Sequence, residues 1–96
     1  MNTAEIAAAI LEIIPDEKHW VKGAARMGDR RCVLDALTCV PARHQERRNF
    51  ISAFRCQASE LYPRISAVQV DVPAFNDHPD VTYTEIRTVL EKMRAG

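Results

Sequence analysis

Hydrophobic residues recur at helical spacing in four stretches of the chain. Between Thr3 and Ile14, isoleucine and alanine fall on one side of a helix, with Thr3 as the expected N-cap and Pro15 as the stop. The other three helices are expected over residues 32–40, 43–61 and 82–95. The hydrophobic pattern therefore predicts a mostly helical protein.

Two stretches depart from the helical period. Residues 19–33 place β-branched and aromatic residues on either side of the turn pair Gly28-Asp29, which predicts a β-hairpin. Gly23 in its first half suits a bulge or a close approach of another backbone. In residues 66–72, valine alternates with polar residues, which predicts a short third strand, although the same spacing also suits a helical turn.

These elements together predict an α+β fold. We expect a small, mostly helical single domain over residues 1–96, in which the β-hairpin, with or without a third short strand, packs against three or four helices. A chain of 96 residues is too short for two separate cores, and 47% hydrophobic residues suit one globular core.

The termini and the cysteines bear on the expected location. No apolar run approaches the roughly 20 residues of a membrane span, and the first residues lack the basic region and cleavage site of a signal peptide. The 3 cysteines are an odd number without Cys-x-x-Cys spacing, which indicates free thiols in a reducing compartment. We expect a cytoplasmic protein that does not contact a membrane.

Charge is unevenly distributed, although 13 basic and 13 acidic residues balance. Residues 22–64 carry nine basic against four acidic side chains, whereas residues 1–21 carry one against four and residues 65–96 three against five. Arg47, Arg48 and Arg55 lie off the apolar stripe of the third helix, and with Arg43 at its start they form a basic face. This basic face is the candidate partner-binding site. The alternative is an ordinary solvated surface that complements the acidic ends of the chain.

A polar loop precedes the last helix. In Phe75-Asn76-Asp77, the Asn76 and Asp77 side chains can accept from backbone N–H groups two residues further on. Asp77 can alternatively pair with Arg26 or Arg31 of the hairpin. Both interpretations give the loop a structural role.

The start of the last helix carries a capping-box pattern, Thr82-x-x-Glu85. We expect the Thr82 hydroxyl to accept from the N–H of Glu85, and the Glu85 carboxylate to accept from the N–H of Thr82. Trp20, the only tryptophan, is expected in the core, with a role as an interface anchor as the alternative. Trp20, Asn76, Asp77, Thr82 and Glu85 are thus interpreted as structural residues.

The sequence predicts neither a metal site nor a cofactor. The spacing of its cysteines and histidines fits no recognised zinc pattern: Cys32, Cys39, Cys56, His19, His44 and His78. Cys32 near a helix start could be a nucleophile, but no orienting group or oxyanion hole is identifiable. We therefore expect no catalytic residue.

Four motifs resemble those of a known family. In order they are Trp20-x-x-Gly23-Ala24, Cys32-Val33-Leu34-x-Ala36-Leu37, Phe75-Asn76-Asp77-x-Pro79 and Thr82-x-x-Glu85-Ile86. The chain is similar to an uncharacterised family of small actinobacterial and actinobacteriophage proteins. The resemblance covers residues 20–37 and 72–95 well and residues 41–66 poorly, and Asp35 stands where glycine is commoner in the family. It implies no known activity, but it implies an actinobacterial cytoplasm, including during phage infection.

These observations favour a non-enzymatic protein-interaction module. The resemblance points to a phage-encoded factor that acts on a protein of an actinobacterial host, and a second copy of the chain is the other possible protein partner. The alternative is a nucleic-acid-binding regulator that uses the basic helix face around residues 43–55. A third hypothesis is a small-molecule or enzymatic site on the Asn76-Asp77 loop, with Trp20 and Cys32 as neighbours.

Overall fold

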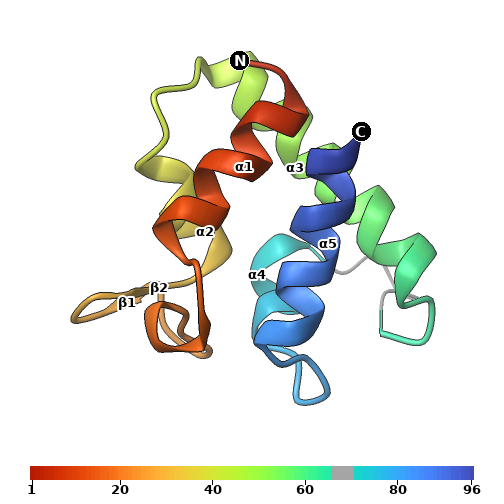
Figure 1. Cartoon of the computed structure of the whole chain (residues 1–96). Coiled ribbons are helices and arrows are strands. Elements are labelled where there is room, and N and C mark those ends of the chain that lie inside the picture. The colour runs from red at the N-terminus through yellow and green to blue at the C-terminus, as the bar shows by residue number, and fades with distance from the viewer. Residues whose placement is uncertain (66–70) are drawn as a thin grey trace.

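The structure is a computed structural model that describes residues 1–65 and 71–96. Over these residues the chain forms five α-helices, a single 3-10 turn and one hairpin (Figure 1). The helices are α1 (Thr3–Ile13), α2 (Val33–Thr38), α3 (His44–Leu61), α4 (Val72–Asn76) and α5 (Tyr83–Ala95). The 3-10 turn is η1 (Glu17–His19), and the strands are β1 (Arg26–Met27) and β2 (Arg30–Arg31). The predicted α+β class is confirmed.

One hydrophobic core joins all five helices. Helix α1 packs along α5, and α3 crosses behind both of them (Figure 1). Each helix contributes fully buried side chains, of which the largest are Phe50, Phe54, Phe75, Ile6, Ile10, Ile86 and Leu90. Three aromatic rings meet edge to face or tilted within this core, since Phe54 lies 6.0 Å from Phe50 and 5.8 Å from Phe75 between ring centroids. This core fixes the helices that carry the polar residues described below.

The predicted hairpin is confirmed, but its strands are short. Met27 pairs with Arg30 and Arg26 with Arg31 in an antiparallel register. Gly28 turns the chain with a φ of +60°, which a side chain would strain. Trp20 lies outside the paired strands and meets Arg31 through an isolated parallel bridge. The hairpin projects from the helical body (Figure 1).

The helix starts differ in part from the prediction. Helix α1 is capped by Asn2 rather than Thr3, because the Asn2 side chain accepts from the N–H of Glu5 and the Glu5 carboxylate accepts from the N–H of Asn2. The third helix begins as expected, with Arg43 as its N-cap, and runs to Leu61. Helix α2, which the sequence predicts over residues 32–40, ends at Thr38, two residues before Val40.

The predicted third strand is wrong for residues 71 and 72, the part of it that the structure describes. Residues 66–70 of that prediction lie outside the described residues. Asp71 is the N-cap of α4, and its side chain accepts from the N–H of Ala74 at 2.9 Å. Val72 is the first residue of α4, and Pro73 follows it in the first turn, where its missing N–H is not needed. The end of the expected strand is therefore a helix start.

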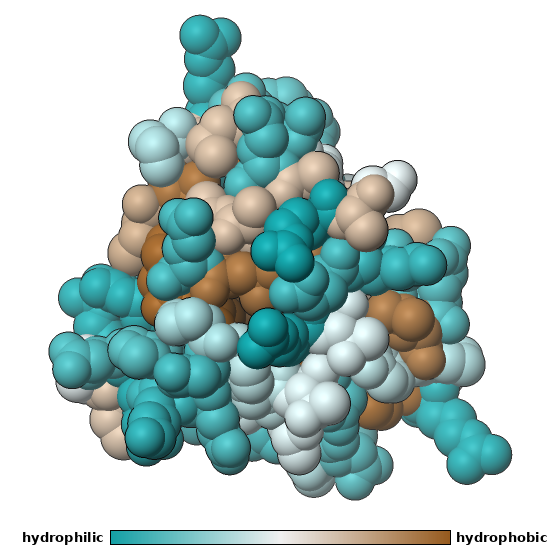
Figure 2. Space-filling view, viewed as in Figure 1, coloured by the Kyte–Doolittle hydropathy of each residue, from teal (hydrophilic) through white to brown (hydrophobic). Residues whose placement is uncertain are grey.

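None of the helices that the structure describes has both the length and the apolar character needed to cross a membrane. The face in Figure 2 is mostly hydrophilic, and strongly hydrophobic residues show there only in small separate patches.

Candidate functional site

The side chain of Asn76 joins three parts of the chain. Its Oδ1 accepts from Nε1 of Trp20 at 2.8 Å and from the N–H of Val33 at 3.2 Å. Its Nδ2 donates to the carbonyl of Val21 at 3.0 Å and to Oδ1 of Asp77 at 2.9 Å. Asn76 is fully buried, so these bonds satisfy both polar atoms of its amide.

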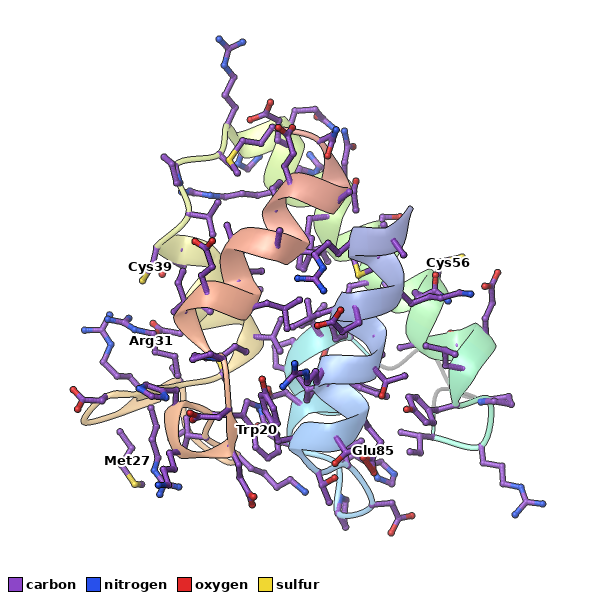
Figure 3. All side chains as sticks on the ribbon, in the orientation of Figure 1. Trp20, Met27, Arg31, Cys39, Cys56 and Glu85 are labelled. Atoms are coloured by element: carbon purple, nitrogen blue, oxygen red, sulfur yellow. The ribbon has the colours of Figure 1, made fainter. Side chains whose placement is uncertain are left out.

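The neighbouring bonds extend this junction along residues 20–23 and 76–78. Oδ1 of Asp77 accepts from the N–H of Gly23 at 2.8 Å, and Nζ of Lys22 donates to the carbonyl of His78 at 2.7 Å. We call this set of hydrogen bonds the clasp. The clasp holds the end of α4 against residues 20–23, which lead into the hairpin. The side chain of Trp20 lies on the side of this segment that faces α5 (Figure 3).

The expected roles of Asn76 and Asp77 need correction. Asn76 belongs to the last turn of α4 and bonds distant residues, so it does not form a local turn with its own backbone. Asp77 contacts the hairpin segment through the backbone of Gly23, not through Arg26 or Arg31. The motif that contains Trp20 and Gly23 and the motif that contains Asn76 and Asp77 are more than fifty residues apart in sequence but in contact in the fold.

The arginines of the hairpin bind Asp35 instead. Nη1 of Arg31 lies 2.7 Å and Nε of Arg26 lies 3.3 Å from Oδ2 of Asp35. Partial burial opposes the charged form of Asp35, but the hydrogen bonds from Arg31 and Arg26 outweigh it and hold the pKa of this carboxyl below its ordinary value. Arg31 on β2 and Asp35 in the first turn of α2 thus form an ion pair between residues four positions apart in sequence.

A hollow of about 450 Å³ lies beside the clasp, between the segment before the hairpin, α2 and α4. Its lining consists mainly of small and apolar residues with two carboxylates: Gly23, Ala24, Ala25, Cys32, Leu34, Asp35, Thr38, Pro73 and Asp77. Cys32, the N-cap of α2, is mostly buried, and its sulfur accepts from the N–H of Asp35 at 3.4 Å. The third hypothesis from the sequence thus has a geometric counterpart, because Asp77 and Cys32 line one hollow next to Asn76 and Trp20.

Sequence reasoning missed most of the residues that form this hollow. Gly23 has a φ of +82°, and an added Cβ there would meet no atom within 4 Å. The signal that could have indicated an unfilled space is the run of small residues Gly23-Ala24-Ala25. Pro73 carried no such signal, because the helix to which it belongs was not predicted.

The cap of α5 differs from the expected capping box. Thr82 is the N-cap, but its side chain makes no hydrogen bond to the backbone of the helix. Its hydroxyl instead donates to the carboxylate of Glu85 at 2.7 Å, while the N–H of Glu85 reaches the carbonyl of Thr82 at 3.2 Å. The start of α5 is anchored more firmly by Tyr83, whose buried hydroxyl donates to the carbonyl of Ile14 at 2.6 Å.

Three of the four arginines predicted for the basic face of α3 are exposed. Arg48 and Arg55 lie seven positions apart on the exposed side of the helix, and Arg43 is exposed at its N-cap. Cys56, on the same exposed side, points away from the core (Figure 3). Within residues 1–65 and 71–96, no carboxylate lies within 4.0 Å of the three exposed guanidinium groups.

Arg47 does not belong to this exposed face, so the prediction for it is wrong. Its Nη2 donates to the carbonyl of Val40 at 2.9 Å, and its Nε is buried without a hydrogen-bond partner in the described part of the chain. Pro41 prevents the chain after α2 from continuing as a helix, and Arg47 supplies a donor for the carbonyl left there. From here on, the arginine face means Arg48 and Arg55 on one exposed side of α3 together with exposed Arg43 at its N-cap.

Glu46 is the acidic residue nearest to the start of the arginine face in sequence, and it is engaged elsewhere. Its carboxylate accepts from the amino terminus of Met1 and, at 2.8 Å, from the N–H of Arg43. The hydrogen bond from the amino terminus, with that from Arg43, holds the pKa of Glu46 below its ordinary value. The side chain of Arg43 is therefore not neutralised by a direct ion pair with Glu46.

No group of three or more histidine, cysteine, aspartate or glutamate side chains is arranged for a metal ion among the residues that the structure describes. Cys39 is exposed at the C-cap of α2, and Cys56 is exposed on α3. Neither cysteine lines the hollow.

The chain was compared with models of protein families. The model of the Family of unknown function (DUF6197) matches residues 1–95. This confirms the resemblance to an uncharacterised family. Neither a curated protein nor a solved structure matches the chain.

Proposed function

We propose that this chain, which belongs to the Family of unknown function (DUF6197), is a non-enzymatic protein-interaction module that binds an acidic protein surface through the arginine face of α3. The observation that carries the proposal is that the arginine face is exposed and makes no ion pair with the described residues. Arg43, Arg48 and Arg55 are exposed, and no carboxylate in the described part of the chain pairs with them. Arg30 and Lys92 are also exposed without an ion pair to the described residues, but Arg48 and Arg55 differ from them in lying together on one side of a long helix.

The geometry of α3 suits docking. The helix is 18 residues long, and it buries Phe50, Phe54 and Ala58 on the opposite side, so its orientation is fixed by the core. Arg48 and Arg55 are separated by about two helical turns, or roughly 10 Å along the axis. Between them lies exposed Ser52, whose small side chain lets a partner approach the helix closely.

Arginine is well suited to such a contact. Its planar guanidinium donates two parallel hydrogen bonds to a carboxylate, and it is enriched in protein interfaces. Because the arginine face is already ordered on a rigid helix, less side-chain and backbone freedom is lost on binding than with a flexible segment.

The nucleic-acid alternative has weaker support. With Arg47 directed to Val40, the exposed face keeps three of the four arginines predicted for it. The chain as a whole has a formal net charge of +0. Binding to a phosphate backbone depends on neutralising many phosphates at once, so a short basic face on a neutral protein favours an acidic protein partner.

The resemblance to actinobacterial and phage proteins supports a particular setting. We propose that the chain acts in the cytoplasm of an actinobacterial cell, as a phage-encoded factor, on a host protein. Three free cysteines agree with a reducing compartment.

Affinity capture tests this proposal. The tagged wild-type chain and an Arg48→Glu/Arg55→Glu variant are used to capture partners from actinobacterial lysate, with and without nuclease. Reversing both charges should remove the partner because the interface loses its attraction and gains repulsion. An Arg30→Glu/Lys92→Glu variant is the matched control, since it changes the net charge equally at exposed positions away from α3.

The expected result is a partner that the wild type and the control retain, that the arginine-face variant loses, and that survives nuclease. Equal capture by all three proteins would refute a role for this face. Loss of the partner from the wild type after nuclease treatment would instead favour the nucleic-acid regulator.

A further inference from the structure

The hollow beside the clasp has the features of a small ligand site. Its volume of about 450 Å³ lies within the range of small-molecule pockets, about 300–1,000 Å³. Three separate segments form its walls: residues 23–25, the first turns of α2, and α4 with its C-cap. It is independent of the arginine face, since Arg31 beside α2 and Cys56 on α3 lie on opposite sides in Figure 3.

The walls of the hollow are held in place before any ligand binds. The clasp fixes α4 to residues 20–23 through the buried amide of Asn76. On the other side, the N–H of Cys32 donates to the carbonyl of Ala25 at 3.0 Å, and Asp35 holds Arg26 and Arg31. A preformed cavity loses less ordering entropy on binding than one that must be assembled.

The lining is apolar on its sides. Leu34 and Pro73 face the hollow together with Ala24 and Ala25, whose small side chains leave the space unfilled. Such walls favour a compact apolar group, because binding removes hydrophobic surface from water.

The two carboxylates of the hollow differ in charge balance. Asp35 is compensated by Arg26 and Arg31. Asp77 uses Oδ1 for the N–H of Gly23 and the amide of Asn76, and no cationic group in residues 1–65 and 71–96 lies within 4.0 Å of it. Its Oδ2 accepts no hydrogen bond from the described residues, and of the two carboxylates that line the hollow, Asp77 is the one without an arginine partner.

We propose that this hollow binds a small organic amine, with the ammonium group donating to Oδ2 of Asp77 and a compact apolar body against Leu34 and Pro73. This site is additional to the arginine face, and it gives the Asp77 motif a role beyond the clasp. Neither a covalent step nor a metal ion is part of the proposal.

Benzylamine and benzyl alcohol are the matched probes, because they share the ring and differ in the charged group. The backbone amide shifts of the ¹⁵N-labelled chain are followed as each probe is added. Benzylamine should produce saturable shifts at Gly23, Ala25 and Leu34, and should bind about fivefold more tightly than benzyl alcohol, as an exposed charge pair allows.

Asp77→Asn separates the charge from the clasp. The introduced amide oxygen can still accept from the N–H of Gly23, so the melting temperature should stay near wild type while the affinity for benzylamine falls about fivefold. The affinity for benzyl alcohol should not change. Equal affinities of the two probes for the wild type, or no saturable shift, would overturn the proposal.

A second pair of variants keeps the test decisive if Asp77→Asn is unstable. Ala24→Leu adds bulk to the wall of the hollow and should abolish the saturable shifts from benzylamine. Ala74→Leu makes the same change at an exposed position of α4 outside the lining, and should leave binding unchanged. Equal binding by both leucine variants would also overturn the proposal.

Discussion

Replacing Asn76 by alanine removes the centre of the clasp. The substitution deletes the acceptor of Trp20 Nε1 and of the Val33 N–H, and the donor to the Val21 carbonyl. Asn76 is fully buried, and Trp20 and Val33 are buried as well, so water does not readily replace the lost bonds.

The expected loss of stability follows from the groups left without partners. A buried donor or acceptor that loses its partner destabilises the folded state by about 1–3 kcal/mol. The two donors, Nε1 of Trp20 and the N–H of Val33, therefore account for a decrease of roughly 2–6 kcal/mol in the free energy of unfolding. We expect about 3 kcal/mol after local relaxation, a large share of the roughly 5–14 kcal/mol typical of a chain of this length. At about 4–8 °C per kcal/mol, the melting temperature should fall by about 12–24 °C.

Urea and thermal unfolding followed by circular dichroism measure this loss. Asn49→Ala is the control, because Asn49 is an exposed asparagine on α3 that makes one side-chain hydrogen bond, with Gln45. It should change the free energy of unfolding by less than about 0.5 kcal/mol.

A double-mutant cycle isolates the central bond of the clasp. Trp20→Phe keeps an aromatic ring but removes the N–H that donates to Asn76. Because both single changes break the same bond, the double variant should lose about 1 kcal/mol less than the sum of the two. A loss below about 1 kcal/mol for Asn76→Ala, or strict additivity in the cycle, would refute the reasoning.

Three further predictions concern the helix caps and two ionisable groups. Asn2→Ala should cost about 1 kcal/mol in urea unfolding because it removes the cap of α1, whereas Thr82→Ala should cost clearly less, since Thr82 bonds only the side chain of Glu85; equal losses would contradict the cap geometry. Burial raises the pKa of Tyr83 despite the opposing charge of Arg87, so the wild type should lose stability above about pH 10, where the unfolded tyrosine ionises first, while Tyr83→Phe should cost about 1 kcal/mol at neutral pH and lack this alkaline loss. The lowered pKa of Asp35 adds stability that is present above the pKa of about 3.9 in the unfolded chain and is lost as pH falls through the folded pKa; the protection factors of the hairpin amides in hydrogen exchange, which correct for the intrinsic pH dependence of the rate, should therefore decrease below about pH 4, and Asp35→Asn should abolish that decrease.

The helical periodicity predicted the long elements because each has a continuous apolar side. The third helix was predicted from about Arg43 to Leu61 and runs from His44 to Leu61, since its stripe of Phe50 and Phe54 repeats at helical spacing. Helix α4 is only 5 residues long, too short for periodicity to separate it from a strand or a loop.

The clasp and the bond of Arg47 to Val40 could not be predicted from local patterns. The sequence marked Trp20, Asn76 and Asp77 as structural, but the bond between Trp20 and Asn76 joins positions 56 residues apart. Arg47 lies three and seven positions before Phe50 and Phe54, so helical spacing places it towards the buried side of α3, but its bond to the Val40 carbonyl carries no such signal. Tertiary contacts of this kind leave no periodic signal.

Site-specific photo-cross-linking tests the central claim, that α3 is the partner-binding surface, most directly. A benzophenone side chain is placed at Ser52, between Arg48 and Arg55, and at Thr88, an exposed control position on α5. The account predicts that irradiation in actinobacterial cells joins the Ser52 derivative to one protein and that Arg48→Glu/Arg55→Glu abolishes the product. A protein cross-linked equally from Thr88, or a product that persists in the arginine variant, would contradict it.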